Sequence, residues 1–519
     1  MEVIRSSVLC RTLAPFWLWL CRCYDGSVLA KVIRGIGSGW DAACRGSVLI
    51  GFLTRDGFLS AAWRDSLVCR ILMAVINLPV KLFQWLYRHI GAALEDSWAA
   101  RLAFNLVEET PILAGWFMLA FLVIPYENWN NAYSLGGFAF CLVLTMAAGI
   151  RKKDYRLDIA AVGPWLLLFA GAVVVSCLLS SSEDSPRFLL YHAACMLCVL
   201  VIVSTVERLD QLQRLMGCAS FAVLVMSCCA FFQRASGIEV NPSYVDMTSE
   251  LNKGMPGRVF AFYENPNAFG EVLSLLIPVV IVYMLTSRRW SGRALGLVSA
   301  LAGCAALIMT YSRASWLGFA FAIFLLVAMW KRNLLPVFVA AAFVGLALLP
   351  DTVFNRILSI FDTSDTSTSS RFPYYQAALT FLKQHPLTGA GLGSDAVRDA
   401  VRGMHLYHGH DYFVHCHNTY LQLWCETGLV GLITFVGGIF WTFKRGAKAA
   451  AKAACSPALR LAVLGGASAL MGSMLCGMAD YTWNYPRVML IFWFVCALTL
   501  AGIRLAGREA EQEPCAEQA

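Results

Sequence analysis

Charged residues are scarce in this 519-residue chain: Asp, Glu, Lys and Arg make up 14% of it, against about 25% in an ordinary globular protein. So few charges cannot cover a water-soluble surface of this size. The apolar content of 58% also excludes an intrinsically disordered chain and a nucleic-acid-binding protein. The apolar residues form runs of about 15 to 22 residues, the length that crosses a bilayer core. The composition therefore predicts an all-α integral membrane protein with many spans.

Two further features are missing from the sequence. The first 23 residues contain an apolar patch, but Arg11 interrupts it and no small-residue cleavage site follows, so we do not interpret them as a signal peptide. The 19 cysteines lie mostly inside apolar runs, where Cys behaves as a small hydrophobic residue. No disulfide framework is readable from their spacing.

Lys and Arg are also absent from three of the connectors between the apolar runs. The twelve runs that we interpret as spans are 111–126, 134–150, 159–179, 187–206, 215–235, 267–286, 294–310, 316–330, 334–350, 418–443, 458–479 and 486–504. Basic connectors (151–156, 207–214, 287–293, 331–333 and 444–448) alternate with connectors that lack Lys and Arg (127–131, 180–186 and 480–484). The positive-inside rule makes the basic set cytoplasmic, which predicts twelve spans with both termini in the cytoplasm.

This topology divides the chain into five parts. Residues 1–110 mix basic residues with Trp, Leu, Ile and Val, a pattern typical of amphipathic helices on the cytoplasmic face. One poor transmembrane span near 66–89 is the alternative. Residues 111–350 carry the first nine predicted spans, and residues 351–417 form a large extracytoplasmic loop. Residues 418–504 hold the last three spans, and residues 505–519 form a cytoplasmic tail. Long loops carry function more often than short ones.

Three of the arginines at the outer side of the membrane stand out in this topology. Arg258 precedes a span, Arg313 lies in a short turn between two spans, and Arg371 opens a helix predicted over 371–385 in the large loop. A guanidinium is always charged and binds phosphate oxygens with two parallel hydrogen bonds. These arginines, with Asn265 and Asn267 near the first, therefore suit a diphosphate whose lipid tail lies in the membrane. The alternative is that they only snorkel to lipid headgroups or pair with a nearby acid.

Histidines are concentrated at the end of the large loop. Five of the eight fall within thirteen residues: His405, His408, His410, His415 and His417. With Cys416 and Asp411 they offer metal ligands, but their spacing matches no compact site and H-E-x-x-H is absent, so we assign no metal. His417 stands at the entry to a span beside Asn418, which would orient its ring. A neutral imidazole there would remove a proton from an acceptor hydroxyl.

Four segments carry a family resemblance when taken in order. They are G-R-V-F-A-F-Y-E-N-P-N-A-F-G (257–270), S-R-A-S-W-L-G (312–318), S-R-F-P-Y-Y-Q-A-A-L with H-P-L-T-G-A-G-L-G (370–379 and 385–393), and H-N-T-Y-L-Q-L-W-C-E-T-G-L-V-G (417–431). This set resembles the O-antigen ligase and O-antigen polymerase superfamily of bacterial membrane glycosyltransferases. The resemblance covers roughly residues 111–504 and leaves the first 110 residues outside it.

The resemblance implies a GT-C-type helical fold and an undecaprenyl-diphosphate-linked glycan as donor. It also implies transfer without metal or cofactor, onto a glycan or glycolipid acceptor at the outer face of the bacterial cytoplasmic membrane. By the same resemblance Arg258 and Arg313 hold the diphosphate, His417 is the catalytic histidine and Arg371 supports them. Asn265, Asn267 and Asn418 are the further substrate-binding candidates.

A mechanism follows from these roles. The arginines neutralise the departing diphosphate while His417 activates the acceptor, and a single displacement inverts the anomeric centre. The competing class is a transporter or flippase for lipid-linked saccharides, which would place its arginines in a cavity at mid-membrane depth. The predicted spans are nearly free of charge, which favours the enzyme.

Overall fold

The computed structural model describes residues 58–148, 157–241, 249–331, 334–360, 371–409, 412–452 and 455–516, with Val245 and isolated positions between 15 and 35. These residues form helices joined by loops, and no β-strand occurs among them. The chain divides into two compact units, one of residues 1–55 and 327–348 and one of residues 56–326 and 349–519. All the candidate site residues belong to the second unit.

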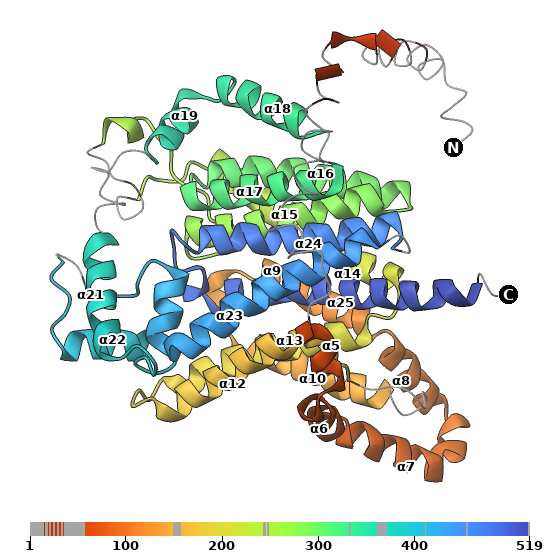
Figure 1. Cartoon of the computed structure of the whole chain (residues 1–519). Coiled ribbons are helices and arrows are strands. Elements are labelled where there is room, and N and C mark those ends of the chain that lie inside the picture. The colour runs from red at the N-terminus through yellow and green to blue at the C-terminus, as the bar shows by residue number, and fades with distance from the viewer. Residues whose placement is uncertain are drawn as a thin grey trace. The chain divides into compact units, whose positions relative to one another are not determined.

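The described residues form α-helices throughout the chain (Figure 1). In order they are α5 (Phe58–Asp65), α6 (Leu67–Ile76), α7 (Leu78–Glu95), α8 (Trp98–Glu108), α9 (Thr110–Val123), α10 (Ala132–Ala148), α11 (Ile159–Val162), α12 (Pro164–Leu179), α13 (Ser185–Thr205), α14 (Leu209–Ala235), α15 (Pro266–Thr286), α16 (Trp290–Met309), α17 (Arg313–Lys331), α18 (Leu335–Ala347), α19 (Asp351–Leu358), α21 (Arg371–Gln384), α22 (Ser394–Gly403), α23 (Thr419–Ala451), α24 (Pro457–Cys476) and α25 (Pro486–Ala516). Several begin with proline in the first turn, for example α12, α15 and α24. Proline is favoured there because its ring fixes a helical φ and its missing N–H needs no partner.

Eight of these helices, among the residues described, are long and apolar enough to cross a membrane: α13, α14, α15, α16, α17, α23, α24 and α25. The number rises to ten if each of two bent helix pairs crosses as one span, and α9, α10 and α12 are apolar but shorter. Each predicted span coincides with an apolar helix. The polytopic all-α class is therefore confirmed, while the count of twelve stays a prediction.

Several helix ends differ from the predicted span ends. The predicted span 159–179 consists of α11 and α12, because Gly163 breaks the helix with a φ of 97°. Two of the basic connectors are largely helical: α14 begins at Leu209 within 207–214, and α23 continues through 444–448 to Ala451. Their Gln, Leu, Lys and Ala residues are good helix formers, so the helix continues past the predicted end of the membrane span. The connector 151–156 and residues 361–370 of the large loop lie outside the described residues.

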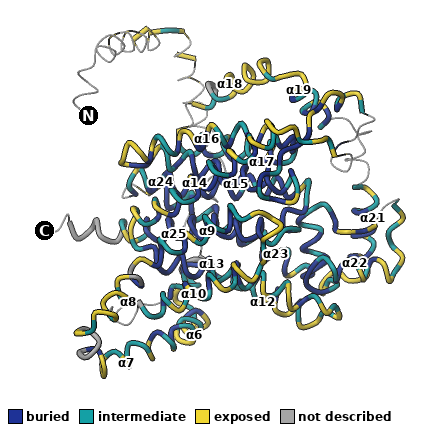
Figure 2. Tube along the Cα trace, turned by 180° about the vertical axis from the view of Figure 1, so that it is seen from behind, coloured by how far each residue is buried: buried dark blue, intermediate teal, exposed yellow. Residues whose placement is uncertain are grey.

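The core of the second unit is built around α25. The apolar part of this helix is entirely buried, and α24 and α15 are mostly buried. Helix α25 packs against α13, α23 and α24, and α24 packs against α15. Figure 2 shows buried positions gathered on these helices, whereas α6, α7 and α8 carry many exposed ones. The last spans in the sequence thus lie at the centre of the second unit, surrounded by the other spans. The loops that join them therefore lie close to the loops of those spans.

The large predicted outer loop is mostly helical where it is described. The helix predicted over 371–385 is present as α21, and it buries Tyr374, Ala377, Ala378, Phe381 and Leu382 along one face. Two helices that the sequence did not predict, α19 and α22, lie in the same loop. Helices α21 and α22 both pack on α23, beyond one of its ends (Figure 1). The loop is therefore a folded layer on the helix that follows it.

The helices over 58–108 belong to the second unit, and hydrogen bonds from two of their side chains join them to residues 157–160. The side chain of Asn77, between α6 and α7, donates to the carbonyl of Leu157 at 3.1 Å and accepts from its N–H at 2.7 Å. The indole of Trp63 donates to the carbonyl of Ala160 at 3.1 Å. Helices are present over 58–108 as expected, and their place on the cytoplasmic face stays a prediction.

Candidate active site

Asp480 lies at the meeting point of three segments that are far apart in the sequence. It stands in the loop between α24 and α25, and its side chain is only 13% exposed. One carboxylate oxygen accepts the backbone N–H of Tyr481 at 2.8 Å and lies 3.5 Å from Nδ1 of His417. The other oxygen accepts Nδ2 of Asn267 at 3.2 Å. A carboxylate against one ring nitrogen of a histidine fixes the ring and its tautomer, which leaves the other nitrogen available as a base.

Arg258 is joined to this aspartate through Asn267. The guanidinium is buried; its Nε donates to the carbonyl of Thr310 at 2.6 Å, and a terminal nitrogen donates to Oδ1 of Asn267. Asn265 caps α15 and accepts the N–H of Asn267 at 2.7 Å, which fixes the first turn of that helix. The result is an unbroken chain of polar contacts from Arg258 through Asn267 and Asp480 to His417.

The backbone at His417 is held in an unusual conformation. Its φ is 44°, a left-handed value that costs a non-glycine residue about 1–3 kcal/mol and persists where surrounding contacts enforce it. Those contacts include the hydroxyl of Tyr375, which donates to the His417 carbonyl at 3.3 Å, and Nδ1 of His415, which accepts the His417 N–H at 3.2 Å. The ring of Tyr374 stands edge-on at 5.1 Å.

Asn418 holds the helix that follows. Its Oδ1 accepts the N–H groups of Tyr420 and Leu421, both at 3.0 Å, and its Nδ2 donates to the carbonyl of Met478 at 2.9 Å. These bonds begin α23 and attach it to the end of α24. Asn418 therefore bonds to backbone groups, and the side chain that lies against the His417 ring nitrogen is Asp480.

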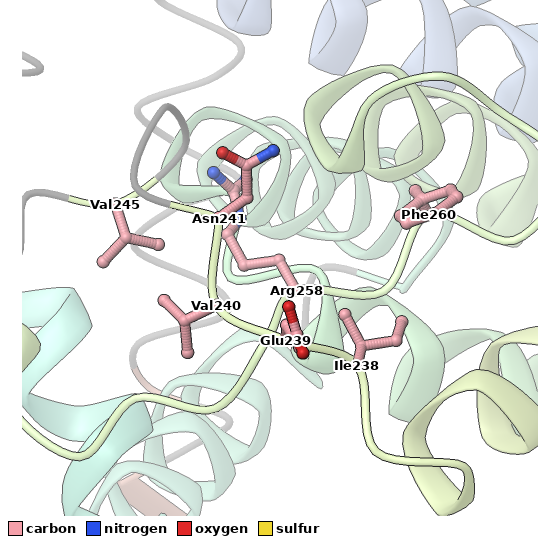
Figure 3. Close-up of a pocket in the computed structure, with 7 residues that line it drawn as sticks. All are labelled: Ile238, Glu239, Val240, Asn241, Val245, Arg258 and Phe260. Carbon is pink, nitrogen blue, oxygen red and sulfur yellow. The ribbon is translucent and has the colours of Figure 1, made fainter.

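Two cavities adjoin this chain of contacts. The smaller, of about 70 Å³, is lined by Asn265, Asn267, Ala268, Glu271, His415, His417, Asp480, Tyr481, Asn484 and Tyr485. The larger, of about 500 Å³, is lined by Ile238, Glu239, Val240, Asn241, Val245, Arg258 and Phe260. In Figure 3 the Arg258 side chain lies near the middle of the second group, beside Asn241. Arg258 thus lines the larger cavity and bonds to Asn267, which lines the smaller one.

Arg313 lies at the other end of the turn that Arg258 touches. Its Nη1 donates to the carbonyl of Ser359 at 2.7 Å and to the Ser359 hydroxyl at 3.0 Å. Arg356, which is buried, donates to the carbonyl of Tyr311 at 3.4 Å and to Oδ1 of Asn252 at 2.9 Å. Three arginines therefore surround the 310–313 turn, and they fix it between α16, α17 and the end of α19.

Arg371 affects the site through its charge. Burial by itself would raise the pKa of Asp480, but the hydrogen bond from His417, followed by the charge of Arg371, holds that pKa below its ordinary value. Asp480 is therefore ionised at neutral pH and presents a negative charge to the His417 ring. Arg371, at the first residue of α21, places a permanent cation near the carboxylate–histidine pair.

The histidine cluster separates into two groups. His405 and His408 are exposed, whereas His415 is buried and its ring lies 4.2 Å from that of His417. His410 and Asp411 lie outside the described residues. Among the residues described, no group of three or more His, Cys, Asp or Glu side chains is arranged to hold a metal ion. Of the described histidines, His415 and His417 line the small cavity.

Asp480 is a site residue that the sequence analysis missed. It lies in D-Y-T-W-N (480–484), which served only as an outer connector without Lys or Arg. The available signal was the acid itself, since Asp480 is the sole acidic residue of that short outer connector. Which histidine it faces depends on contacts across 63 positions of sequence, and no local pattern reveals them.

The buried His415 makes the stability of the protein depend on pH. Burial, aided by the charge of His417, lowers the pKa of His415 from 6.5 to about 3. Because the folded value lies below the unfolded one, the unfolded chain binds more protons between these values, so stability is lost as pH falls through this window. We expect the melting temperature in detergent to drop between about pH 7 and about pH 4.5. His415→Asn should show a smaller drop, and equal drops in both proteins would contradict this origin.

Comparison with known protein families identifies part of the chain. Residues 297–436 match the family model described as O-antigen ligase. No curated protein matches the chain. The matched stretch contains Arg313, Arg371 and His417, whereas Arg258 precedes it and Asp480 follows it. The match agrees with the resemblance found in the sequence.

Proposed function

Since residues 297–436 place the chain in the O-antigen ligase and polymerase superfamily of membrane glycosyltransferases, we propose that it transfers a glycan from undecaprenyl diphosphate to an acceptor hydroxyl. The reaction takes place at the outer face of the bacterial cytoplasmic membrane. The observation that carries this proposal is the contact chain from Arg258 through Asn267 and Asp480 to His417. It joins an arginine suited to binding diphosphate and a histidine suited to acting as a general base through one network of polar contacts, beside two cavities.

The proposed reaction is a single displacement. Nε2 of His417 takes the proton of the acceptor hydroxyl while the hydroxyl oxygen attacks the anomeric carbon of the donor. The bond from that carbon to the diphosphate breaks on the opposite side, so the product has the inverted configuration. Asp480 stabilises the imidazolium that forms, and Arg258 and Arg313 neutralise the diphosphate that leaves. A diphosphate is already a good leaving group, so we propose that neither a metal nor a cofactor takes part.

The proposed topology is supported by which loops meet at the site. The site takes Arg258 and Asn267 from around the start of α15, His417 from the start of α23 and Asp480 from the loop between α24 and α25. The alternation of basic connectors assigns all three segments to the outer side. With twelve spans and both termini in the cytoplasm, the catalytic groups therefore share the compartment that receives the glycan.

Transfer by the purified protein tests the function. We expect protein in lipid vesicles to move a labelled glycan from undecaprenyl diphosphate to a glycan or glycolipid acceptor, and to do so equally with excess EDTA. Stoichiometric zinc that is lost together with activity would contradict the metal-free mechanism. Movement of the intact lipid-linked donor across the bilayer without transfer would instead favour the transporter.

A further inference from the structure

Helix α23 is interrupted shortly after it begins. Gly428 has a φ of 68°, and a Cβ on it would lie 1.9 Å from the carbonyl oxygen of Leu387, so only glycine fits. The segment 385–393 of the large loop enters this interruption. The carbonyl of Pro386 accepts the N–H of Leu429 at 3.0 Å and the indole of Trp424 at 2.8 Å, and the N–H of Ala390 donates to the carbonyl of Cys425 at 2.6 Å. The loop therefore uses backbone groups that the broken helix leaves unpaired.

Glu426 is buried at this interruption, with 2% of its surface exposed. Its carboxylate accepts three donors: Nε2 of Gln422 at 2.8 Å, the hydroxyl of Tyr481 at 3.0 Å and the backbone N–H of Gly393. Its backbone carbonyl accepts the hydroxyl of Ser176 at 2.6 Å. The Gln422 amide nitrogen and the Gly393 N–H can only donate, so this position favours a side chain whose oxygens accept.

The same carboxylate reaches both members of the carboxylate–histidine pair. Tyr481 bonds to Glu426 through its hydroxyl and to the Asp480 carboxylate through its backbone N–H, at 2.8 Å. Gln422 bonds to Glu426 with its amide nitrogen, while its oxygen accepts the N–H of Cys416 at 2.9 Å. Cys416 directly precedes His417. Two short routes, one through a tyrosine and one through a glutamine, therefore run from Glu426 to the two site residues.

We propose that Glu426 is a positioning residue that fixes Asp480 and His417 relative to each other and locks segment 385–393 onto α23. The role rests on the proposed function, because the geometry it sets is that of the acceptor base. Neither a proton nor a bond is exchanged at Glu426. Its contribution is to hold the pair in reacting geometry, where a displacement of about 1 Å costs about 10²-fold in rate.

The sharpest variant is Glu426→Gln, which keeps the volume but replaces one accepting oxygen with a donating NH₂. One of the three donors then loses its partner. We expect kcat to fall by about 10²-fold, with KM for the lipid-linked donor unchanged because Arg258 and Arg313 are untouched. Tyr481→Phe removes the route to Asp480 alone and should lower kcat in the same manner.

A double-mutant cycle on kcat separates positioning from general damage. If both variants act through the Glu426–Tyr481 bond, combining them should cost little more than the worse single change, because coupled residues are not additive. The matched control is Tyr420→Phe, whose hydroxyl donates to the carbonyl of Met474; its effect should add to that of Glu426→Gln. Thr442→Val alters a buried hydroxyl on the same helix that bonds only within it, and it should keep normal kcat.

Two outcomes would overturn the proposal: normal kcat in Glu426→Gln, or full additivity of Glu426→Gln with Tyr481→Phe. If Glu426→Gln fails to fold, Tyr481→Phe decides, and normal kcat in that variant overturns it too. His417→Ala is measured alongside. Absence of transfer by the unaltered protein would refute the proposed function, and full transfer by His417→Ala would refute the assignment of the base. Loss of transfer in His417→Ala together with normal kcat in Glu426→Gln would refute only the positioning role.

Discussion

We expect His417→Ala to abolish detectable transfer while donor binding survives. A positioned general base is typically worth about 10²–10⁴-fold in rate. The ring of His417 is held by the buried Asp480 carboxylate, and its backbone by Tyr375 and His415. Donor binding depends on the arginines instead. The measurement is transfer of a labelled lipid-diphosphate glycan, with a separate donor-binding assay for each variant.

The other histidines provide the controls for this experiment. His405→Ala and His408→Ala should lower the rate of transfer much less. Both side chains are exposed, and both residues lie earlier in the loop than His415 and His417. If His417→Ala transfers normally while His415→Ala or His410→Ala is inactive, the base has been assigned to the wrong histidine. If all five single variants stay active, histidine base catalysis is wrong for this protein.

Arg258→Lys should lose most of the activity while the protein remains in the membrane at its normal level. The guanidinium donates to the Thr310 carbonyl and to Asn267 from different nitrogens, and a single ammonium cannot reproduce that geometry together with two-pronged phosphate binding. The expected loss for a charged hydrogen-bonded pair is about 2–5 kcal/mol, which is upwards of about thirtyfold in kcat/KM.

Arg313→Lys tests the second arginine in a different way. Both of its bonds to Ser359 come from one nitrogen, so a lysine can keep that contact but loses the second prong toward phosphate. We expect a comparable loss of transfer. Arg398→Lys is the matched control, since Arg398 pairs with Asp395 on the same outer loop at 2.6 Å. Normal transfer by both the Arg258 and Arg313 variants would mean that the diphosphate binds elsewhere.

The sequence alone predicted the membrane class and the positions of the apolar helices. Hydropathy and the sign of connector charge are properties of short stretches, and the bilayer acts on each stretch separately. The helix α21 was likewise predictable, because Pro386 follows it and its buried side chains recur every three or four residues. The segments that contain Arg258, Asn267 and His417 were singled out because polar residues at the ends of apolar runs are unusual.

Tertiary structure alone decided how these segments combine. Asp480 carries no local pattern, and its importance follows from its contacts with residues 63 and 213 positions away. The interruption of α23 at Gly428 could not be predicted for a related reason. A glycine within an apolar run is compatible with a continuous helix or with a break, and only the contacts of segment 385–393 with α23 show that the helix breaks here. The hydropathy of each short stretch thus determined which segments enter the membrane. Long-range packing determined which side chains share the site, because it brings together residues that lie far apart in the sequence.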